Sequence, residues 1–379
     1  LRVRASTMAS KRQSLSRGAR RLADRAVLSA VNGFVYATEG AARPGRHGAA
    51  RDVVFSKGKL ELSRIRPIRD VEYELGSEVH HIAFERHRTP LMLIPPLMVR
   101  PYVYDLRPEH SMVRTLRNAG FDVFVVDFGV PDHEDERVRL DDYVLDYVPA
   151  CVDAVLSTSG APGVSLSGYC MGGIFCLMHA ATHHDARVRN IVTIGAPVNF
   201  TKMRAAYLAS RIGALGIGPL MDLIGNVPGK VSSFGFKLMS GARALTKWGD
   251  FVANLDDEDF VRSFDAVNTW VNDLIPYPKE AFKQMVREVV SGNRLIVGGL
   301  SFGDKPCDLG AVTQPILAFA GKSDNIATPQ ATEAIVDLVA SSDKTLVPVS
   351  GGHVGVVAGS AAPREVWQPM IDWLSPRSR

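Results

Sequence analysis

The sequence predicts an α/β fold, in which helices cover both faces of a mostly parallel sheet and a helical insertion interrupts the chain. Three observations lead to this prediction. Short apolar runs alternate with amphipathic stretches along most of the 379 residues. Residues 154–184 contain no Asp, Glu, Lys or Arg, and they fit a buried strand followed by a buried helix better than a membrane span. Residues 200–300 lack the alternation and contain apolar helical stretches instead.

Each element follows from its own local pattern. Apolar runs bounded by Gly, Pro, Asp or Ser indicate strands, and periodic apolar stretches indicate helices. The strands predicted in this way are 71–75, 80–84, 91–94, 122–126, 164–167, 192–194, 315–320 and 345–349, the first two forming a hairpin. The predicted helices are 106–118, 140–156, 171–182, 331–338 and 364–373, with 207–224 and 234–245 inside the insertion.

These elements divide the chain into four segments. We expect a basic N-terminal tail over 1–55, partly disordered and partly helical around 19–34, and a first part of the core over 56–199. A helical cap over 200–300 and a second part of the core over 301–379 follow. Residues 1–50 carry ten Arg or Lys and only two acidic residues. The simplest interpretation is a solvated tail, and the alternative is a segment that binds an anionic surface or a partner.

Composition excludes several classes of protein. A hydrophobic content of 46% excludes a disordered chain, and a net charge of +4 is too small to indicate a nucleic-acid-binding protein. The four Cys match no zinc or CxxC spacing, so we expect free thiols in a cytoplasmic protein. We expect no metal, no cofactor and no transmembrane segment.

The sharpest local feature is a glycine-rich turn around a cysteine. After the buried strand 164–167 the chain reads Gly168-Tyr169-Cys170-Met171-Gly172-Gly173, and an apolar helix follows. A nucleophile on a sharp strand-to-helix turn requires small residues on either side of it, and the helix N-terminus favours the thiolate form of the cysteine. The backbone N–H of Met171 would face an oxyanion formed on an attacked carbonyl. The alternative is a structural cysteine in a tight turn. The pattern is typical of the α/β-hydrolase fold.

The residues that would activate Cys170 follow in the chain order expected for this fold. Asp324 comes directly after the strand 315–320, and His353 comes after the strand 345–349. His353 is the only His beyond residue 184. Asp127, at the end of another strand, is an alternative acid, although a structural carboxylate is the simpler interpretation. The second oxyanion donor should follow the first buried parallel strand, where the N–H of Leu97 is the candidate and Met98 the next one.

Two further groups of residues favour structural roles. His179, His183 and His184 lie at a helix end, where compensation of the helix dipole is a simpler interpretation than metal binding. Cys176, Cys151 and Cys307 are expected in the core.

From about residue 60 to 375 the chain resembles polyhydroxyalkanoate synthases, particularly the short class III catalytic subunit. The Cys170 turn is the most specific match. The other matching segments include Arg100-Pro101-Tyr102, Leu140-Asp141-Asp142-Tyr143, Gly195-Ala196-Pro197-Val198-Asn199-Phe200, Gly225-Asn226-Val227-Pro228-Gly229 and Gly351-Gly352-His353-Val354-Gly355. Positions at which the chain departs from the family pattern include Val99, Phe128 and residues 266–269.

The resemblance implies an acyltransferase that uses a 3-hydroxyacyl-CoA and makes a polyester. Cys170 would carry the acyl group as a thioester. His353 would deprotonate Cys170 and assist the incoming hydroxyl, and Asp324 would support His353 or activate the 3-hydroxyl of the monomer. The resemblance also implies a homodimer or a companion synthase subunit, and a cytoplasmic location that extends to the surface of polyester granules.

Two other functions remain open at this point. The same fold and residues would serve a hydrolase, such as a thioesterase, an esterase or an intracellular polyester depolymerase. A non-enzymatic homologue would bind granules or a synthase through its basic tail, although the presence of Cys170, Asp324 and His353 argues against it.

Overall fold

The structure is a computed structural model that describes residues 21–22, 24–34, 36, 48–68, 70–75, 78–82, 84–203, 207, 217–239, 248–249 and 251–379. Its centre is an eight-stranded sheet in the order β1-β2-β8-β5-β9-β10-β13-β14. The strands are β1 (Arg51–Lys57), β2 (Leu60–Ile65), β5 (Leu91–Ile94), β8 (Val123–Asp127), β9 (Val164–Tyr169), β10 (Val188–Ile194), β13 (Ile316–Gly321) and β14 (Lys344–Val349). All neighbours from β8 to β14 pair in parallel, whereas β1–β2 and β2–β8 are antiparallel. The predicted α/β class with a mostly parallel sheet is therefore confirmed.

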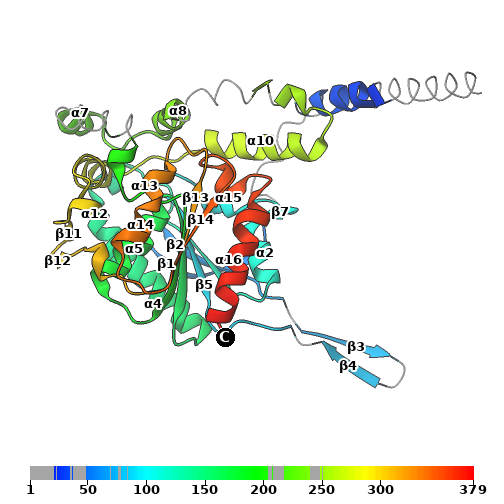
Figure 1. Cartoon of the computed structure of the whole chain (residues 1–379), viewed down its shortest axis with the longest axis horizontal. Coiled ribbons are helices and arrows are strands. Elements are labelled where there is room, and N and C mark those ends of the chain that lie inside the picture. Colours follow the sequence, from blue (N-terminus) through cyan, green and yellow to red (C-terminus); the bar gives the residue numbers. More distant parts are fainter. Residues whose placement is uncertain are drawn as a thin grey trace, which may run out of the picture.

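Helices connect the parallel strands and cover both faces of the sheet (Figure 1). The helices around the sheet are α2 (Met112–Asn118), α3 (Leu140–Asp142), α4 (Val148–Ser159), α5 (Met171–His183), α13 (Pro329–Glu333), α14 (Ile335–Leu338), α15 (Gly355–Ala358) and α16 (Gln368–Leu374). Shorter 3-10 or π turns are η1 (Pro101–Tyr104), η2 (His133–Arg137), η3 (Tyr143–Tyr147), η6 (Leu309–Ala311), η7 (Pro363–Trp367) and η8 (Ser375–Arg377).

The core has two layers because alternate residues of each strand point to opposite faces. In β5, Met92 and Ile94 join the cluster that includes residues of α4 and α5, whereas Leu91 and Leu93 join the cluster on the face covered by α2, α15 and α16. All four of these side chains are fully buried. Strands that are apolar on both faces are typical of a parallel sheet between two layers of helices.

The connection between β10 and β13 contains residues 200–300, which we expected to form a helical insertion. Its described helices are α7 (Ile217–Ile224), α8 (Gly229–Met239), α10 (Glu258–Asn272), α11 (Lys279–Gln284) and α12 (Arg294–Val297), with η4 (Phe200–Lys202) and η5 (Met285–Ser291). Figure 1 shows α7, α8 and α10 along one edge of the molecule. The predicted helices 207–224 and 234–245 overlap α7 and α8, and their remaining residues lie largely outside the described part of the chain.

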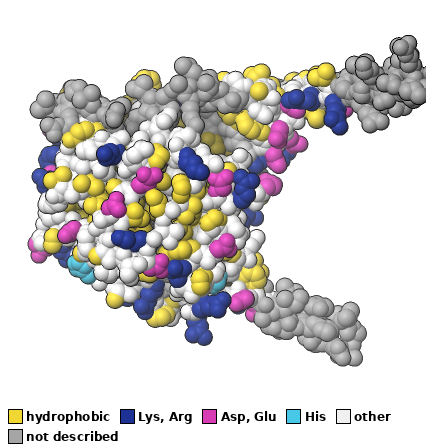
Figure 2. Space-filling view, viewed as in Figure 1, with side chains coloured by type: hydrophobic (Ala, Val, Ile, Leu, Met, Phe, Trp, Pro, Cys, Tyr) yellow, Lys and Arg dark blue, Asp and Glu magenta, His cyan; other side chains and the backbone are white. Residues whose placement is uncertain are grey.

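Three smaller sheets lie outside the central one. They are the hairpins of β3 (Val71–Leu75) with β4 (Glu78–Ile82), β6 (Asp105–Arg107) with β7 (His110–Ser111), and β11 (Ser301–Phe302) with β12 (Lys305–Pro306). The β3–β4 hairpin was predicted, and it projects from the body of the molecule in Figure 1. The described part of the face shown in Figure 2 carries acidic and basic side chains interspersed.

The predicted helix 106–118 is wrong over its first half. Residues 105–111 form the β6–β7 hairpin, and α2 begins only at Met112. The buried carboxylate of Asp105 accepts the Ser111 hydroxyl at 2.6 Å and the Ala49 N–H at 2.6 Å, and the Ser111 side chain caps α2 through the N–H of Arg114. These contacts keep residues 105–111 extended up to the N-cap of α2. A periodic pattern of apolar residues cannot indicate such contacts.

The N-terminal part of the sheet was not predicted. Strand β1 begins at Arg51, within the segment expected to be a tail, and pairs with β2 at the antiparallel edge. Residues 24–34 are helical, as expected around 19–34. This helix contacts the insertion, because Arg25 pairs with Asp256 at 2.6 Å and the Asn32 side chain donates to the Leu255 carbonyl at 2.7 Å. Among the described residues, no helix combines the length and the apolar character needed to cross a bilayer.

Candidate active site

Cys170 occupies the turn between β9 and α5. Its φ is 52° and its ψ is −120°, so the backbone adopts a left-handed conformation that residues other than glycine rarely occupy. The N–H of Cys170 donates to the Ile194 carbonyl on β10 at 2.8 Å, and its carbonyl accepts from Gly173 and Ile174. The surrounding structure thus holds a strained residue in place, which is common at functional sites.

The glycines around Cys170 allow this turn to exist. A Cβ at Gly172 would lie 1.9 Å from the Ile94 carbonyl oxygen, and a Cβ at Gly168 would lie 2.2 Å from backbone atoms of Gly172. A Cβ at Gly173 would lie 2.7 Å from the Ala196 side chain. The first turn of α5 therefore packs directly on the end of β5 and on β9.

Asp324 and His353 lie at the ends of the neighbouring strands β13 and β14. The His353 Nδ1 atom is 2.7 Å from Oδ2 of Asp324, and both side chains are buried. The other oxygen of Asp324 accepts the N–H groups of Ile326 and Ala327, each at 2.8 Å. The carboxylate is thereby locked toward the imidazole.

The imidazole of His353 also reaches Cys170. The two side chains lie within hydrogen-bonding distance of each other. Burial by itself lowers the pKa of His353, but the Cys170 sulfur and the Asp324 carboxylate outweigh it and raise that pKa above its usual value. The hydroxyl of Tyr169 donates to the His353 carbonyl at 3.1 Å, which ties the His353 loop to the residue before Cys170. The structure thus brings together the three side chains that the sequence predicts.

Cys170 differs from the other cysteines in exposure. It is partly exposed, whereas Cys151, Cys176 and Cys307 are buried free thiols. Burial raises the pKa of Cys151 to about 12 and that of Cys307 to about 11, and it raises the pKa of Cys176 as well. Thiols of this kind stay protonated and inert, in agreement with the core positions predicted for them.

The two predicted oxyanion donors, the N–H groups of Met171 and Leu97, follow the neighbouring strands β9 and β5. Met171 is the first residue of α5, where an N–H has no acceptor within the helix. Leu97 follows β5 and two prolines, and β5 pairs with β9 so that Ile94 lies opposite Gly168. The contact of Gly172 with the Ile94 carbonyl brings the loop after β5 next to the first turn of α5. Met171 and Leu97 therefore remain the predicted oxyanion donors.

A cavity of about 670 Å³ opens beside His353. Its walls include Ser263 and Val267 of α10, Arg107 and His110 of the β6–β7 hairpin, and the loop that carries His353. Its volume is in the range of sites that hold small organic molecules. Arg107 and His110 are lining residues that sequence reasoning missed, because the predicted helix 106–118 concealed the hairpin.

The alternative acid Asp127 has a local role. Its carboxylate accepts the N–H of Gly129 at 2.9 Å and so stabilises the turn after β8. His353 already has its carboxylate partner in Asp324. The structure thus agrees with the structural interpretation of Asp127.

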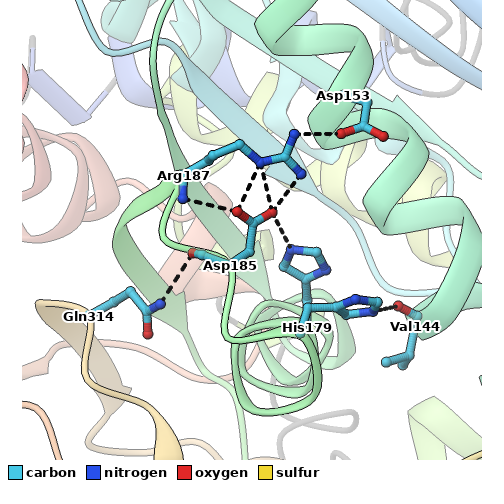
Figure 3. A network of polar contacts seen from close by, with 7 residues as sticks. Val144, Asp153, His179, Asp185, Arg187 and Gln314 are labelled. Carbon is cyan, nitrogen blue, oxygen red and sulfur yellow. Dashed lines mark hydrogen bonds and ion pairs between the residues drawn. The ribbon is translucent and has the colours of Figure 1, made fainter. Parts of the chain in front are cut away.

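His179, near the end of α5, belongs to a polar network (Figure 3), and its ring stacks on that of His183. Buried His179 lies 3.8 Å from Asp185, which binds Arg187 at 2.8 Å, and His183 contacts the Val144 carbonyl at 2.9 Å. His184 ends the helix in a left-handed conformation. Within the described residues no group of three or more His, Cys, Asp or Glu is arranged to hold a metal ion.

Comparisons with known proteins agree with this geometry. Residues 103–216 match the family model described as the alpha/beta hydrolase fold. A solved structure of a lipase candidate from Sulfolobus solfataricus has a TM-score of 0.50 and 15% identity, covering 88% of this chain and 99% of that one. At that level of identity the likeness shows the fold alone.

Sequence comparison identifies relatives with higher identity over most of the chain. The poly(3-hydroxyalkanoate) polymerase subunit PhaC of Allochromatium vinosum is 33% identical over 329 residues, which cover 86% of this chain and 88% of the relative. The PhaC subunit of Haloferax mediterranei is 32% identical over 331 residues, and the match spans 64% of that protein. Together with the fold and the Cys170 turn, these matches show that the chain belongs to the poly(3-hydroxyalkanoate) polymerase family of PhaC subunits.

Proposed function

We propose that this protein is a poly(3-hydroxyalkanoate) synthase, an acyltransferase that moves 3-hydroxyacyl groups from CoA through a cysteine thioester to a growing polyester. The observation that carries the proposal is the strained turn that presents partly exposed Cys170 to the His353–Asp324 pair, in a chain that is 33% identical to a PhaC subunit over 86% of its length.

In the first half-reaction Cys170 is the nucleophile. His353 takes the proton of the thiol, and the thiolate attacks the carbonyl carbon of the acyl-CoA. The negative charge that develops on the carbonyl oxygen is stabilised by the N–H groups of Met171 and Leu97. The bond from the carbonyl carbon to the CoA sulfur then breaks, and the CoA thiolate takes the proton from His353. The product is an acyl group bound to Cys170 as a thioester.

In the second half-reaction an alcohol replaces the thiolate. The hydroxyl of another 3-hydroxyacyl unit attacks the Cys170 thioester, and His353 accepts the hydroxyl proton. An ester C–O bond forms, the C–S bond breaks, and His353 returns a proton to Cys170. Asp324 stabilises the imidazolium in both steps and keeps its Nδ1 atom protonated.

The insertion over 200–300 acts as a cap that keeps water from the thioester. Helix α10 forms one wall of the cavity beside His353, so the cap borders the place where the acyl group would sit. Exclusion of water distinguishes transfer to an alcohol from hydrolysis. We infer that the acyl-CoA approaches the His353 side of the site through this cavity.

Partners and location follow from the same activity. The relatives are called polymerase subunits, which supports a companion subunit for this chain, with a homodimer as the alternative assembly. The four free cysteines are in keeping with a reducing cytoplasm. An insoluble polyester product would hold the enzyme at the surface of its granules.

Product analysis tests the proposal. Purified protein is incubated with 3-hydroxybutyryl-CoA, and CoA release, polymer and free 3-hydroxybutyrate are measured. We expect polymer and CoA from the native protein, nothing from Cys170→Ala, and full activity from Cys176→Ala, which removes a buried thiol of the same helix. Free acid without polymer would instead indicate a hydrolase.

A further inference from the structure

One buried tyrosine of the segment before α11 has a hydroxyl that the described protein leaves unpaired. Tyr277 lies just before α11 and is only 3% exposed. Its hydroxyl is buried and has no hydrogen-bond partner among the described residues. A buried hydroxyl is normally hydrogen-bonded, so an orphaned one calls for a ligand or another explanation.

Among the described residues, Cys170 adds to the raised pKa of three buried tyrosines, and these three differ in one respect. Tyr104 donates its hydroxyl to the Ile94 carbonyl at 2.8 Å, and Tyr169 donates to the His353 carbonyl at 3.1 Å. Both hydroxyls are therefore occupied by the backbone. Tyr277 is the third, and its hydroxyl alone of the three is unpaired.

The backbone around Tyr277 is fixed on two sides. Tyr277 and Val227 exchange N–H to carbonyl hydrogen bonds in both directions, each 2.9 Å long. Two residues before Tyr277, the N–H of Ile275 donates to the Met98 carbonyl at 3.0 Å. Met98 belongs to the loop that carries Leu97, so the segment runs beside the candidate oxyanion donors.

The segment Gly225-Asn226-Val227-Pro228-Gly229 holds the backbone of Tyr277 in this position. Gly225 has a φ of 80°, which turns the chain into the bridge to Tyr277. The Asn226 side chain accepts the N–H of Lys279 at 2.9 Å. A Cβ at Gly229 would lie 2.0 Å from the Leu274 carbonyl oxygen, so only glycine permits this approach. The motif thus positions the segment that carries Tyr277.

The hydroxyl of Tyr277 keeps its proton under working conditions and is available as a hydrogen-bond donor. Burial raises the pKa of Tyr277, and the neighbouring Cys170 adds to that shift, so the phenol stays protonated. In the proposed mechanism, the N–H groups of Met171 and Leu97 bind the carbonyl oxygen of the acyl group on Cys170. The polar group that remains on a 3-hydroxyacyl chain is its 3-hydroxyl.

We propose that Tyr277 is a specificity-determining residue, whose hydroxyl donates a hydrogen bond to the 3-hydroxyl of the acyl group carried on Cys170. This inference rests on the proposed synthase function. A site built to bind a substrate hydroxyl discriminates strongly against an analogue that lacks it, because the buried group is then left unpaired.

The test compares two donors, 3-hydroxybutyryl-CoA and butyryl-CoA, by the rate at which each acylates Cys170. For Tyr277→Phe we expect kcat/KM with 3-hydroxybutyryl-CoA to fall by about tenfold or more, while the rate with butyryl-CoA is unchanged. The control is Tyr147→Phe, which removes a half-buried hydroxyl of η3, and we expect it to change neither rate.

The melting temperature separates this role from a structural one. Since the Tyr277 hydroxyl has no partner in the protein, its removal should leave the Tm unchanged or raise it. An equal fall in kcat/KM with both acyl-CoA substrates, or no fall with either, would overturn the assignment of Tyr277. If the native protein is acylated by neither donor, the proposed synthase function itself fails.

Discussion

The imidazole of His353 and the carboxylate of Asp324 are joined by a hydrogen bond of 2.7 Å in a buried site. The second carboxylate oxygen is held by the N–H groups of Ile326 and Ala327. Asp324 therefore cannot turn away, and Nδ1 of the imidazole is committed to it. Nε2 is left for Cys170. This one contact sets both the orientation and the protonation of the base.

Replacement of Asp324 by asparagine should abolish most of the activity. The two backbone N–H groups would keep the amide oxygen, so the amide NH2 would face His353 and force its proton onto Nε2. The imidazole could then no longer accept the Cys170 proton. We expect the rate of CoA release to fall by about a hundredfold to ten-thousandfold. Asp127→Asn is the matched control, and full loss in that variant would show that the wrong acid has been assigned.

The protonation of His353 should make stability depend on pH. Its pKa is raised in the folded protein, so the protonated imidazole stabilises the fold fully below its usual value of 6.5. This stabilisation is lost as the pH rises through the raised pKa. We expect the free energy of unfolding to decrease with pH above 6.5 in the native protein, and the His353→Gln variant to lose that part of the slope. An unchanged slope in the variant would contradict the raised pKa.

A methyl group at Gly172 should disrupt the turn that holds Cys170. Because the new Cβ would lie 1.9 Å from the Ile94 carbonyl oxygen, β5 and α5 would have to separate. We expect Gly172→Ala to lose about 3 kcal/mol or more of stability, measured by denaturant unfolding. Gly235→Ala in α8, where a Cβ meets nothing within 4 Å, should instead gain about 0.5–1 kcal/mol. Similar effects of the two substitutions would argue against the packing described here.

The network at the end of α5 should stabilise the fold without affecting catalysis (Figure 3). His179 and Arg187 lower the pKa of Asp185. The ionised carboxylate therefore stabilises the fold above the usual pKa of 3.8, and this stabilisation is lost as the pH falls below that value. We expect Asp185→Asn to cost about 1–3 kcal/mol at neutral pH and to leave the rate of CoA release unchanged. Asp153→Asn, which removes the exposed partner of Arg187, should cost about 0.5 kcal/mol or less. A loss of activity in Asp185→Asn would link this network to the active site.

The site could be predicted from the sequence because its residues obey local rules. Cys170 is surrounded by the glycines that a strained turn needs, and Asp324 and His353 follow directly after apolar strands. In a parallel sheet the carboxyl ends of the strands lie at the same edge, so the chain order alone predicts that these residues meet.

Other features depend on contacts between distant residues. Strand β1 has mostly exposed or half-exposed side chains and follows a basic segment, so no buried apolar run marks it. The hairpin before α2 depends on Asp105 binding Ala49, which is 56 residues away. The unpaired hydroxyl of Tyr277 becomes evident only when Val227 and Ile275 hold it in place. No pattern within a short window contains this information.

Peptide mass spectrometry tests most directly whether Cys170 carries the acyl group. The protein is mixed with 3-hydroxybutyryl-CoA, stopped with acid and digested, and the acylated peptide is identified. We expect an added 3-hydroxybutyryl unit or oligomer on the peptide that contains Cys170. The addition should be present in the Cys176→Ala variant and absent from the Cys170→Ala variant. Release of CoA with no acyl group on Cys170, or an acyl group that persists in Cys170→Ala, would contradict it.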